Sequence, residues 1–271
     1  LIKNYRVIPA KELWKKMLKV LFETSHPWCT FKDPCNIRYT NQHEGVVHSS
    51  NLCTEITLHT KASEYEKGEK TKIGETAVCN LGSVNLLNHL KDDNTLDYDK
   101  LKNTIHVAMR ALDSVVDLNF YPTKEASNSN LRNRPVGLGL MALHDVLHKM
   151  NINIDSDEAI KFNDHLFEFY SYNAISASSN LAKEKGSYET YQGSLWSQNI
   201  FPIDSYNVLT EYRKASTIGG GETLTSEWQE LRRHVSEHGM RNSNVMAIAP
   251  TATIGYINGV EQSIEPNFSV L

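Results

Sequence analysis

The chain is short of several features that would assign it to a broad class at once. Its 271 residues contain only four cysteines, Cys29, Cys35, Cys53 and Cys79, and no two of them form a Cys-x-x-Cys pair. This excludes a disulfide-rich secreted scaffold and argues against a structural zinc site. No apolar run approaches the ~18 residues that mark a membrane-spanning helix, and the mean hydropathy is −0.44.

An excess of charge of one sign is also missing. The 28 Lys and Arg residues nearly balance the 32 Asp and Glu residues, and the formal net charge is −4. A nucleic-acid-binding protein usually gathers a basic excess on one face, so this composition argues against that class. The N-terminus lacks both a secretion signal and an initiating Met. We therefore expect a cytoplasmic chain that is processed or is one piece of a larger whole.

Hydrophobic periodicity predicts helices separated by short apolar strands, which is typical of an α/β fold. The expected helices cover residues 10–25, about 20 residues beginning near 101, the stretch that follows 136–140 and runs through 150, residues 155–186, and a last segment from 226. Extended segments are expected over 51–60 and 245–250, an irregular stretch over 28–50, an exposed loop over 61–74 and a glycine hinge at 219–221.

The most informative extended segment contains Asn51, Cys53 and Glu55. In a strand these three residues would point to the same side, so one face would carry an amide, a thiol and a carboxylate. A thiol beside a hydrogen-bonding amide and a potential general base could act on a hydroxylated carbon. The alternative, on spacing alone, is a half-buried strand whose cysteine belongs to the core.

A second candidate site is the turn that follows the apolar segment 245–250. Its sequence, Thr-Ala-Thr-Ile-Gly over 251–255, could present hydroxyls and backbone N–H groups to a phosphate. It lacks the Gly-Lys-Ser/Thr element of a Walker loop, and an ordinary strand-to-helix turn is the alternative. The Gly-x-Gly at 137–139 lacks the third glycine of a dinucleotide fingerprint, so it indicates close backbone packing.

Two histidine pairs occur at helical i, i+4 spacing, His144 with His148 and His234 with His238. Neither pair has Glu directly after its first histidine, as the zinc motif H-E-x-x-H requires. We interpret them as ordinary helix histidines, and a zinc hydrolase is disfavoured.

Five motifs occur along the chain in one order, at 31–36 (FKDPCN), 49–56 (SSNLCTEI), 77–81 (AVCNL), 249–253 (APTAT) and 261–266 (EQSIEP). Together they resemble the large, catalytic subunit of class I ribonucleotide reductase, and the resemblance extends over essentially the whole chain. The motif Asn-Leu-Cys-Thr-Glu at 51–55 resembles the corresponding motif of class I rather than that of the cobalamin-dependent class.

The resemblance implies that residues 1–271 are the central portion of a ten-stranded α/β barrel, a single partial domain with a helix-rich second half. Cys53 would lie on a central finger loop, where its thiyl radical abstracts the 3′-hydrogen of a ribonucleoside diphosphate and the 2′-hydroxyl leaves as water. Glu55 would be the base on the 3′-hydroxyl, and Asn51 would hydrogen-bond the substrate.

The resemblance also implies that Cys79 is one of two cysteines that reduce the 2′ position and end as a disulfide, its partner lying outside this chain. Cys29 and Cys35 match no catalytic position. The substrate phosphates would be held by Thr251, Ala252, Thr253 and Ile254.

Several parts of the family pattern are missing from the sequence: the effector-binding region, the relay tyrosines and the cysteine-bearing tail. We therefore expect no metal or cofactor in this chain itself, and ATP or deoxynucleotide effectors to bind elsewhere. The expected partners are companion pieces of the catalytic subunit, a metal-containing small subunit that supplies the radical, and a thioredoxin or glutaredoxin system. No nucleic-acid or membrane partner is expected, and the chain should not turn over alone.

Two other functions compete with this hypothesis. One is a non-catalytic nucleotide-binding or assembly module that kept the fold, against which the joint retention of Asn51, Cys53, Glu55 and Cys79 argues. The other is a thiol–disulfide oxidoreductase using Cys53 and Cys79, but such enzymes usually keep a Cys-x-x-Cys pair at a helix N-terminus.

Overall fold

The computed structural model describes residues 6–204, 211–212 and 226–267. The chain divides into two compact units, Leu1–Lys32 and Asp33–Leu271. The first unit consists mainly of α1 (Ala10–Thr24), which matches the predicted helix and ends where Ser25, in a left-handed conformation, donates its N–H to Leu21 O. No residue of α1 is buried, and its apolar side chains are exposed or half-buried.

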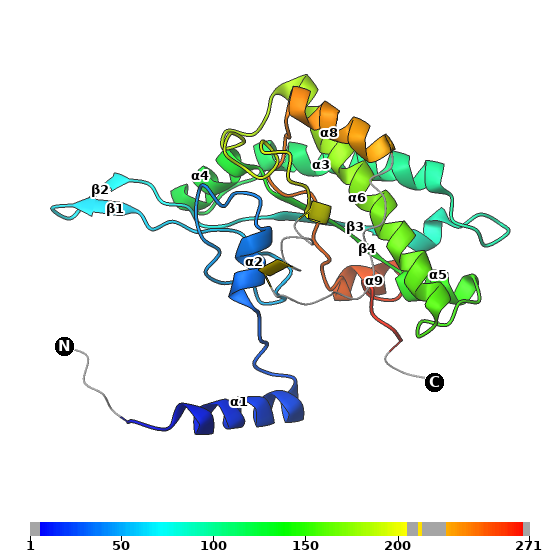
Figure 1. Ribbon diagram of the computed structural model, residues 1–271, viewed down its shortest axis with the longest axis horizontal. Helices are drawn as coiled ribbons and strands as arrows, with labels where there is room; N and C mark the ends of the chain where they lie inside the picture. The colour runs from blue at the N-terminus through cyan, green and yellow to red at the C-terminus, as the bar shows by residue number, and fades with distance from the viewer. Residues whose placement is uncertain (1–5, 205–210, 213–225, 268–271) are drawn as a thin grey trace. The chain divides into compact units, whose positions relative to one another are not determined.

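The second unit is built on a pair of parallel strands. Strand β3 (Asn80–Asn85) pairs in parallel with β4 (Val136–Met141), and Asn80 lies opposite Val136. On the other edge of β4, Leu138 forms a parallel bridge with Met246. Figure 1 shows β3 and β4 lying side by side. The segment expected to be a strand over 245–250 is thus an extended partner of β4 but not a regular strand, because its pairing with β4 is a single bridge at Met246 and its last hydrogen bond to β4 comes from Ala247 N.

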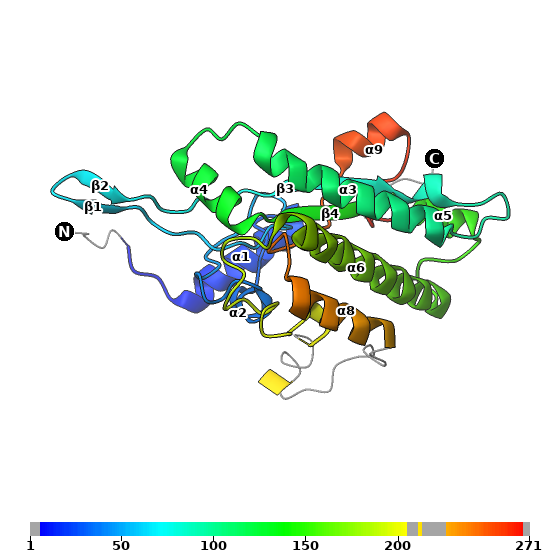
Figure 2. The same ribbon diagram turned by 90° about the horizontal axis from the view of Figure 1, so that it is seen from above.

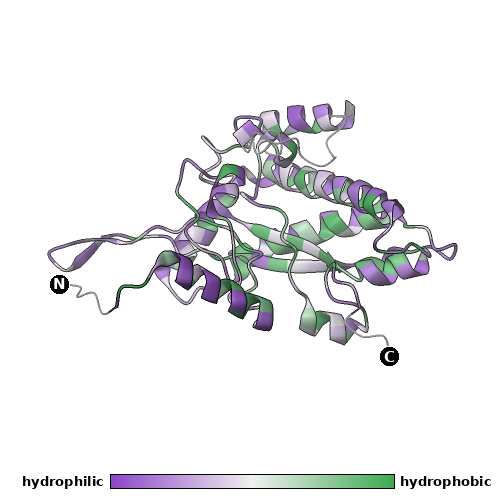
Figure 3. Cartoon of the chain, turned by 60° about the horizontal axis from the view of Figure 1, so that its bottom comes forward, coloured by the Kyte–Doolittle hydropathy of each residue, from purple (hydrophilic) through white to green (hydrophobic). Residues whose placement is uncertain are grey.

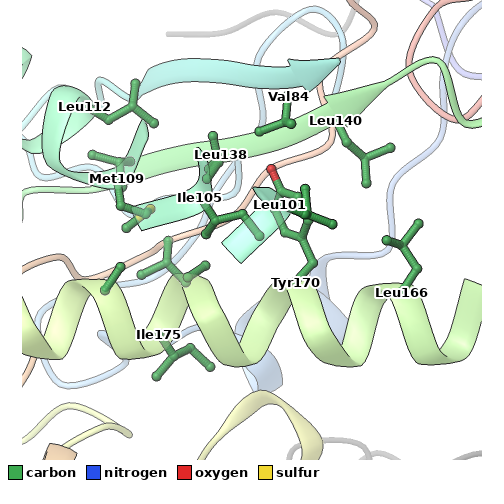
Figure 4. Close-up of a cluster of buried hydrophobic side chains, with 14 of the residues drawn as sticks. Val84, Leu101, Ile105, Met109, Leu112, Leu138, Leu140, Leu166, Tyr170 and Ile175 are labelled. Carbon is green, nitrogen blue, oxygen red and sulfur yellow. The ribbon is translucent and has the colours of Figure 1, made fainter. Parts of the chain in front are cut away.

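Helices cover one face of this strand pair. They are α3 (Tyr98–Leu118), α6 (Asp157–Lys185) and, packed against α6, α8 (Ser226–His238). Because side chains alternate along a strand, Val136, Leu138 and Leu140 of β4 enter the helix-covered core. Figure 4 shows β4 side chains meeting those of α3 and α6, among them Ile105, Met109, Leu166, Tyr170 and Ile175. The intervening Gly137 and Gly139 face the opposite side of the sheet.

The long helix α6 is bounded by its caps. The Ser156 hydroxyl accepts a hydrogen bond from Ala159 N, so Ser156 is the N-cap. The sequence prediction that Asp155 caps the start of the helix is off by one residue, because the side chain that accepts from the third helical amide is that of Ser156. At the other end Gly186, with φ 84°, caps the helix as predicted.

Shorter elements complete the second unit. The seven-residue helix α2 (Lys32–Arg38) occupies part of the stretch predicted to be irregular. It was missed because Pro34 resembles a helix breaker, yet proline is tolerated in the first turn of a helix. The remaining short elements are the 3-10 helix η1 (Leu86–His89) and the helices α4 (Lys124–Asn133), α5 (Leu143–Lys149) and α9 (Ala252–Asn258).

The predicted exposed loop over 61–74 is exposed but not a loop. It forms an antiparallel hairpin of β1 (Glu64–Glu66) and β2 (Glu69–Lys72), whose strand residues are all exposed. Lys67 and Gly68 both have positive φ, 50° and 89°, which suits a tight hairpin turn. Figure 3 shows this hairpin to be hydrophilic throughout, so turn geometry and cross-strand pairs hold it together.

The predicted α/β class is correct, and the second half of the chain is rich in helix, as expected. Within the described residues the strands form two two-stranded sheets and no closed sheet. The ten-stranded barrel with its finger loop therefore stays a prediction, and the hinge expected at 219–221 lies outside the described residues. Figure 2 shows α3 and α6 running alongside the β3–β4 pair. No helix in the described part of the chain is long and apolar enough to cross a membrane.

Candidate functional site

The segment that contains Asn51 and Glu55 is a turn, so the prediction of a strand there is wrong. Thr54 has φ 64°, and its N–H bonds Asn51 O at 3.1 Å. The Asn51 side chain explains the difference, because its Oδ1 accepts from Ile56 N at 3.0 Å and so competes with extended pairing. Asn51 Nδ2 also donates to Glu55 Oε2 at 2.6 Å. The predicted amide–carboxylate pair therefore exists, but a turn rather than strand alternation produces it.

Cys53 lies on this turn between the amide and the carboxylate. It is half-buried, whereas the neighbouring Leu52 is 90% exposed. The Cys53 carbonyl accepts a hydrogen bond from Thr54 Oγ1 at 2.7 Å. In the described part of the chain no hydrogen bond reaches the Cys53 sulfur, so its thiol is held only by the backbone of the turn.

Cys79 directly precedes β3 and points to the face of the sheet that the helices leave open. Burial, together with the smaller effect of the Glu55 carboxylate, raises the pKa of the Cys79 thiol to about 12. The thiol therefore stays protonated at neutral pH, because both effects disfavour a buried anion. Ile56, the residue after Glu55, packs against the same small apolar cluster as Cys79, which connects the turn to the start of β3.

Both Cys79 and the 245–250 segment pack against Gly137 of β4. A Cβ at position 137 would lie 3.4 Å from Cys79 Sγ and only 2.8 Å from Ala247 Cβ. A Cβ at Gly139 would lie 2.4 Å from Ala247 O. The close packing predicted from the Gly-x-Gly spacing is confirmed. Sequence reasoning did not place Gly137 beside the thiol, although two glycines on one strand face signal that something approaches that face.

The residues predicted to hold phosphates lie at the start of α9. Thr251, at φ 54°, is buried, and its hydroxyl accepts from Ser263 N at 2.7 Å. The three residues that follow, Ala252, Thr253 and Ile254, are exposed, and the first N–H groups of a helix have no intrahelical acceptor. Among the described residues, no hydrogen bond connects Thr251–Ile254 to the Asn51–Glu55 turn or to Cys79.

The histidine pairs have structural partners, in keeping with their interpretation as ordinary helix histidines. Asn267 N donates to His144 Nδ1 at 3.0 Å, and His234 Nδ1 shares a hydrogen bond of 2.9 Å with Ser179 Oγ. The rings of each pair contact one another.

Sequence reasoning missed a buried cluster made of Glu44, His59 and Glu75, whose potential ligand atoms all lie within 4.8 Å of one another. Lys61 contacts both carboxylates, and Arg132 NH1 lies 2.6 Å from Glu75 Oε1. These cations already neutralise the carboxylates, which argues against a metal ion. Thirty-one positions separate the first residue of the cluster from the last (75 − 44 = 31), so no local spacing could have revealed it.

A comparison with known families places this geometry in context. A family model described as ribonucleotide reductase, barrel domain, matches residues 2–271. The chain belongs to this family. The resemblance inferred from the five motifs is therefore correct at the level of the family.

Curated relatives are similar to this ribonucleotide reductase barrel chain over nearly all of its length. The ribonucleoside-diphosphate reductase subunit alpha of Chlamydia muridarum is 50% identical over 270 residues, covering 100% of the chain and 25% of that protein. The subunit alpha of Helicobacter pylori strain J99 is 38% identical, covering 98% of the chain and 38% of that protein. The large chain of Encephalitozoon cuniculi is 36% identical, covering 97% and 31%. The chain thus spans a quarter to about two-fifths of the length of these relatives.

Proposed function

We propose that this chain supplies the radical-bearing part of a ribonucleoside-diphosphate reductase and works together with companion polypeptides. The observation that carries the proposal is the grouping of Asn51, Glu55 and Cys79, with Cys53 on the turn between the first two. A hydrogen-bonded carboxylate next to a protonated thiol provides a proton acceptor and a hydrogen donor in one place. Three of the curated relatives carry the corresponding activity in their names.

In the proposed reaction, a Cys53 thiyl radical removes the 3′-hydrogen atom of the substrate, forming an S–H bond and leaving a carbon radical. Glu55 accepts the proton of the 3′-hydroxyl, and the 2′-hydroxyl leaves as water. Cys79 and a second cysteine of a companion polypeptide supply two electrons and two protons in all, and they end as a disulfide. One of the protons goes to the departing water and the other is bound at C2′. Cys53 then returns its hydrogen atom to C3′ and becomes a thiyl radical again, and Glu55 returns its proton to the 3′-oxygen. The metal centre of a small subunit supplies the oxidation that first forms the Cys53 radical.

The high pKa of Cys79 suits this reducing role. A thiol whose burial and carboxylate neighbour keep it protonated can deliver hydrogen. It is poorly suited to a thiol–disulfide oxidoreductase, which needs a thiol of lowered pKa as its attacking group. The thiol chemistry therefore favours the reductase over that alternative.

The phosphates of the substrate would bind at the first turn of α9. Ala252, Thr253 and Ile254 are exposed there, and the first N–H groups of a helix favour an anion. Thr251 would fix the position of this turn, because its hydroxyl is tied to Ser263 N.

Exposed apolar side chains support the need for companion polypeptides that complete a ten-stranded barrel around a finger loop. In the described residues β3 has β4 on one side and no strand on the other. An unpaired strand edge beside apolar surface is a site for pairing with further strands. The exposed apolar residues on β3 and around the end of α3 are Leu81, Val115, Leu118 and Phe120.

Reconstitution tests the proposed function. The chain would be combined with polypeptides that supply the rest of the catalytic subunit, a small subunit, a ribonucleoside diphosphate and a dithiol reductant, and deoxynucleotide formation would be measured. Cys53→Ser should abolish the product, because serine cannot form the radical at an accessible potential. The control Cys29→Ser, at an exposed cysteine of the first unit, should leave the rate unchanged.

Two outcomes would contradict the proposal. Product formation that survives Cys53→Ser would exclude the radical role of this residue. Binding of the diphosphate without turnover in any mixture would instead indicate a non-catalytic nucleotide-binding or assembly module.

A further inference from the structure

The segment that carries Asn51, Cys53 and Glu55 is closed at its base by a buried chain of hydrogen bonds. The Tyr39 hydroxyl lies 2.6 Å from His59 Nδ1, and His59 Nε2 lies 3.0 Å from Glu75 Oε2. Tyr39 is 4% exposed, and His59 and Glu75 are each 2% exposed. Because residues 39 and 59 bracket the turn, the first of these bonds joins the two ends of the segment.

The donors and acceptors along this chain follow from the charge of Glu75. Burial alone would raise the pKa of Glu75, but hydrogen bonds from His59 and Asn133 lower it to about 2, so the carboxylate is ionised and can only accept. His59 Nε2 therefore carries a proton and donates a hydrogen bond to Glu75. His59 Nδ1 and the Tyr39 hydroxyl share the other hydrogen bond of the ring. Each polar group of the chain has a partner.

Glu75 in turn anchors the chain to α4, the helix that leads into β4. Asn133 Nδ2 donates to Glu75 Oε2 at 2.7 Å, and Arg132 NH1 donates to Oε1 at 2.6 Å. Lys61 adds a second cation, with its Nζ 3.3 Å from Glu75 Oε1. The base of the segment is thus fixed to a rigid element rather than to another loop.

Tyr39 also links the segment to the reducing thiol. Its ring forms a small buried apolar cluster with Val47 and Leu58, both of which belong to the bracketed segment. Cys79 packs against the same cluster, as do Cys35, Ile56 and Ala77. Tyr39 therefore joins the two ends of the segment through its hydroxyl, and its ring belongs to the apolar cluster against which Cys79 packs.

We propose that Tyr39 and His59 are positioning residues that hold the Asn51–Glu55 turn at a fixed distance from Cys79. The idea rests on the proposed function for its meaning in catalysis. The hydrogen bond between the Tyr39 hydroxyl and His59 Nδ1, which we call the latch, can be tested without turnover. Without the latch, the turn would keep its internal hydrogen bonds but would lose its fixed distance from the thiol.

Amide hydrogen exchange of the full chain tests the latch directly. Tyr39→Phe removes only the hydroxyl, and exchange in the peptide that covers residues 44–60 should rise about tenfold, the change expected for the loss of one buried hydrogen bond. Exchange in the peptide that covers 101–116 of α3 should stay the same. His59→Gln keeps an amide near the Nε2 position for Glu75 but loses the partner of Tyr39, so it should reproduce the effect of Tyr39→Phe.

Two controls separate a latch from a general loss of stability. Tyr170→Phe also removes a buried phenolic hydrogen bond of 2.6 Å, the one to Gly139 O in the helix-covered core. It should leave exchange over 44–60 unchanged. The double variant Tyr39→Phe/His59→Gln should exchange no faster than either single variant, because both break the same bond. Unchanged exchange in Tyr39→Phe, or an equal rise over 44–60 and 101–116, would overturn the proposal.

Activity provides the second readout. In the reconstituted reductase, Tyr39→Phe should lower kcat about tenfold with little change in KM, because the latch contacts the turn and not the phosphate site. A lower kcat in Tyr170→Phe of the same size would contradict a positioning role. If the unmodified chain gives no turnover, the proposed function fails, whereas the exchange measurements still decide whether the latch exists.

Discussion

The two faces of the β3–β4 pair are held in place by different forces. Among the residues that the structure describes, thirty buried apolar residues from β3, β4, α3, α6, α8 and neighbouring segments form one continuous core on the helix-covered side. In the same part of the chain, the buried apolar cluster around Tyr39 on the open face has three members. Polar contacts make up the difference there, because Glu75 alone accepts from His59, Asn133 and Arg132.

The difference between the faces indicates that the helix-covered face provides most of the stability, whereas the residues proposed to react lie on the open face. Apolar burial is non-directional and hardly depends on pH, so the helix-covered face can hold the strands whatever happens in the site. Hydrogen bonds fix distances and angles but depend on protonation. The residues proposed to react lie on the face that is held by directional contacts.

The largest effect should come from opening the helix-covered core. Ile105 is 0% exposed, and Ile105→Ala should lower the free energy of unfolding by about 3 kcal/mol, because it loses transfer energy and leaves a cavity. Urea unfolding followed by circular dichroism measures the change. The control Ile160→Ala removes the same atoms at a position that is 66% exposed and should have little effect. Equal losses in both variants would contradict the assignment of this core.

A smaller effect, with a pH dependence that the core lacks, should follow from changing Glu75. Glu75→Gln should cost about 2 kcal/mol at neutral pH, because it removes a charged acceptor from several donors. The pKa of Glu75 falls from 4.5 to about 2 on folding, so its contribution is full above 4.5 and is lost as pH falls toward 2.

Urea unfolding of the original chain and of the Glu75→Gln variant at several pH values would reveal this loss. The gap between the two should close as pH falls from 4.5 toward about 2, whereas the gap for Ile105→Ala should persist. Glu189→Gln is the matched control, because Glu189 also pairs with Arg132 but is 65% exposed. A gap for Glu75→Gln that stays constant over this range would show that the carboxylate is not held as described.

The smallest effect is expected in the exposed hairpin. Lys72→Ala breaks the contact between Lys72 Nζ and Glu64 Oε1 at 2.9 Å, in which both side chains are mostly exposed. Exposed ion pairs add little to stability, so the midpoint of unfolding should not move measurably, and added salt should not change that result. A clear shift of the midpoint would mean that the hairpin contributes to the stability of the open face.

Much of the fold could be predicted from periodicity, because the long elements bury one continuous stripe. The apolar stripe over Leu101, Ile105 and Leu112 predicted α3, and Gly186 predicted the end of α6. Short elements could not be predicted in this way. Helix α2 has seven residues, and hairpin β1–β2 has no buried residue in its strands, so neither has an apolar pattern to detect.

The sequence predicted that the side chains of Asn51 and Glu55 lie together, but not the conformation that brings them together. The spacing of Asn51 and Glu55 pointed to a shared strand face, whereas the Asn51 side chain folds the backbone into a turn. The cluster of Glu44, His59 and Glu75 was not predicted at all, because its members meet only through tertiary structure. Side-chain to backbone competition and long-range contacts are the two causes, and neither has a period in the sequence.

The protonated state of Cys79 also affects how fast small oxidants in solution would oxidise its thiol. Its raised pKa keeps the thiol almost entirely protonated at pH 7. Electrophiles, peroxides and stray disulfides react with the thiolate, so they would consume this group far more slowly than an ordinary surface cysteine. In the proposed reducing role of Cys79, burial beside a carboxylate would therefore protect its electrons from small oxidants in solution while leaving them available to a reaction partner held against the thiol.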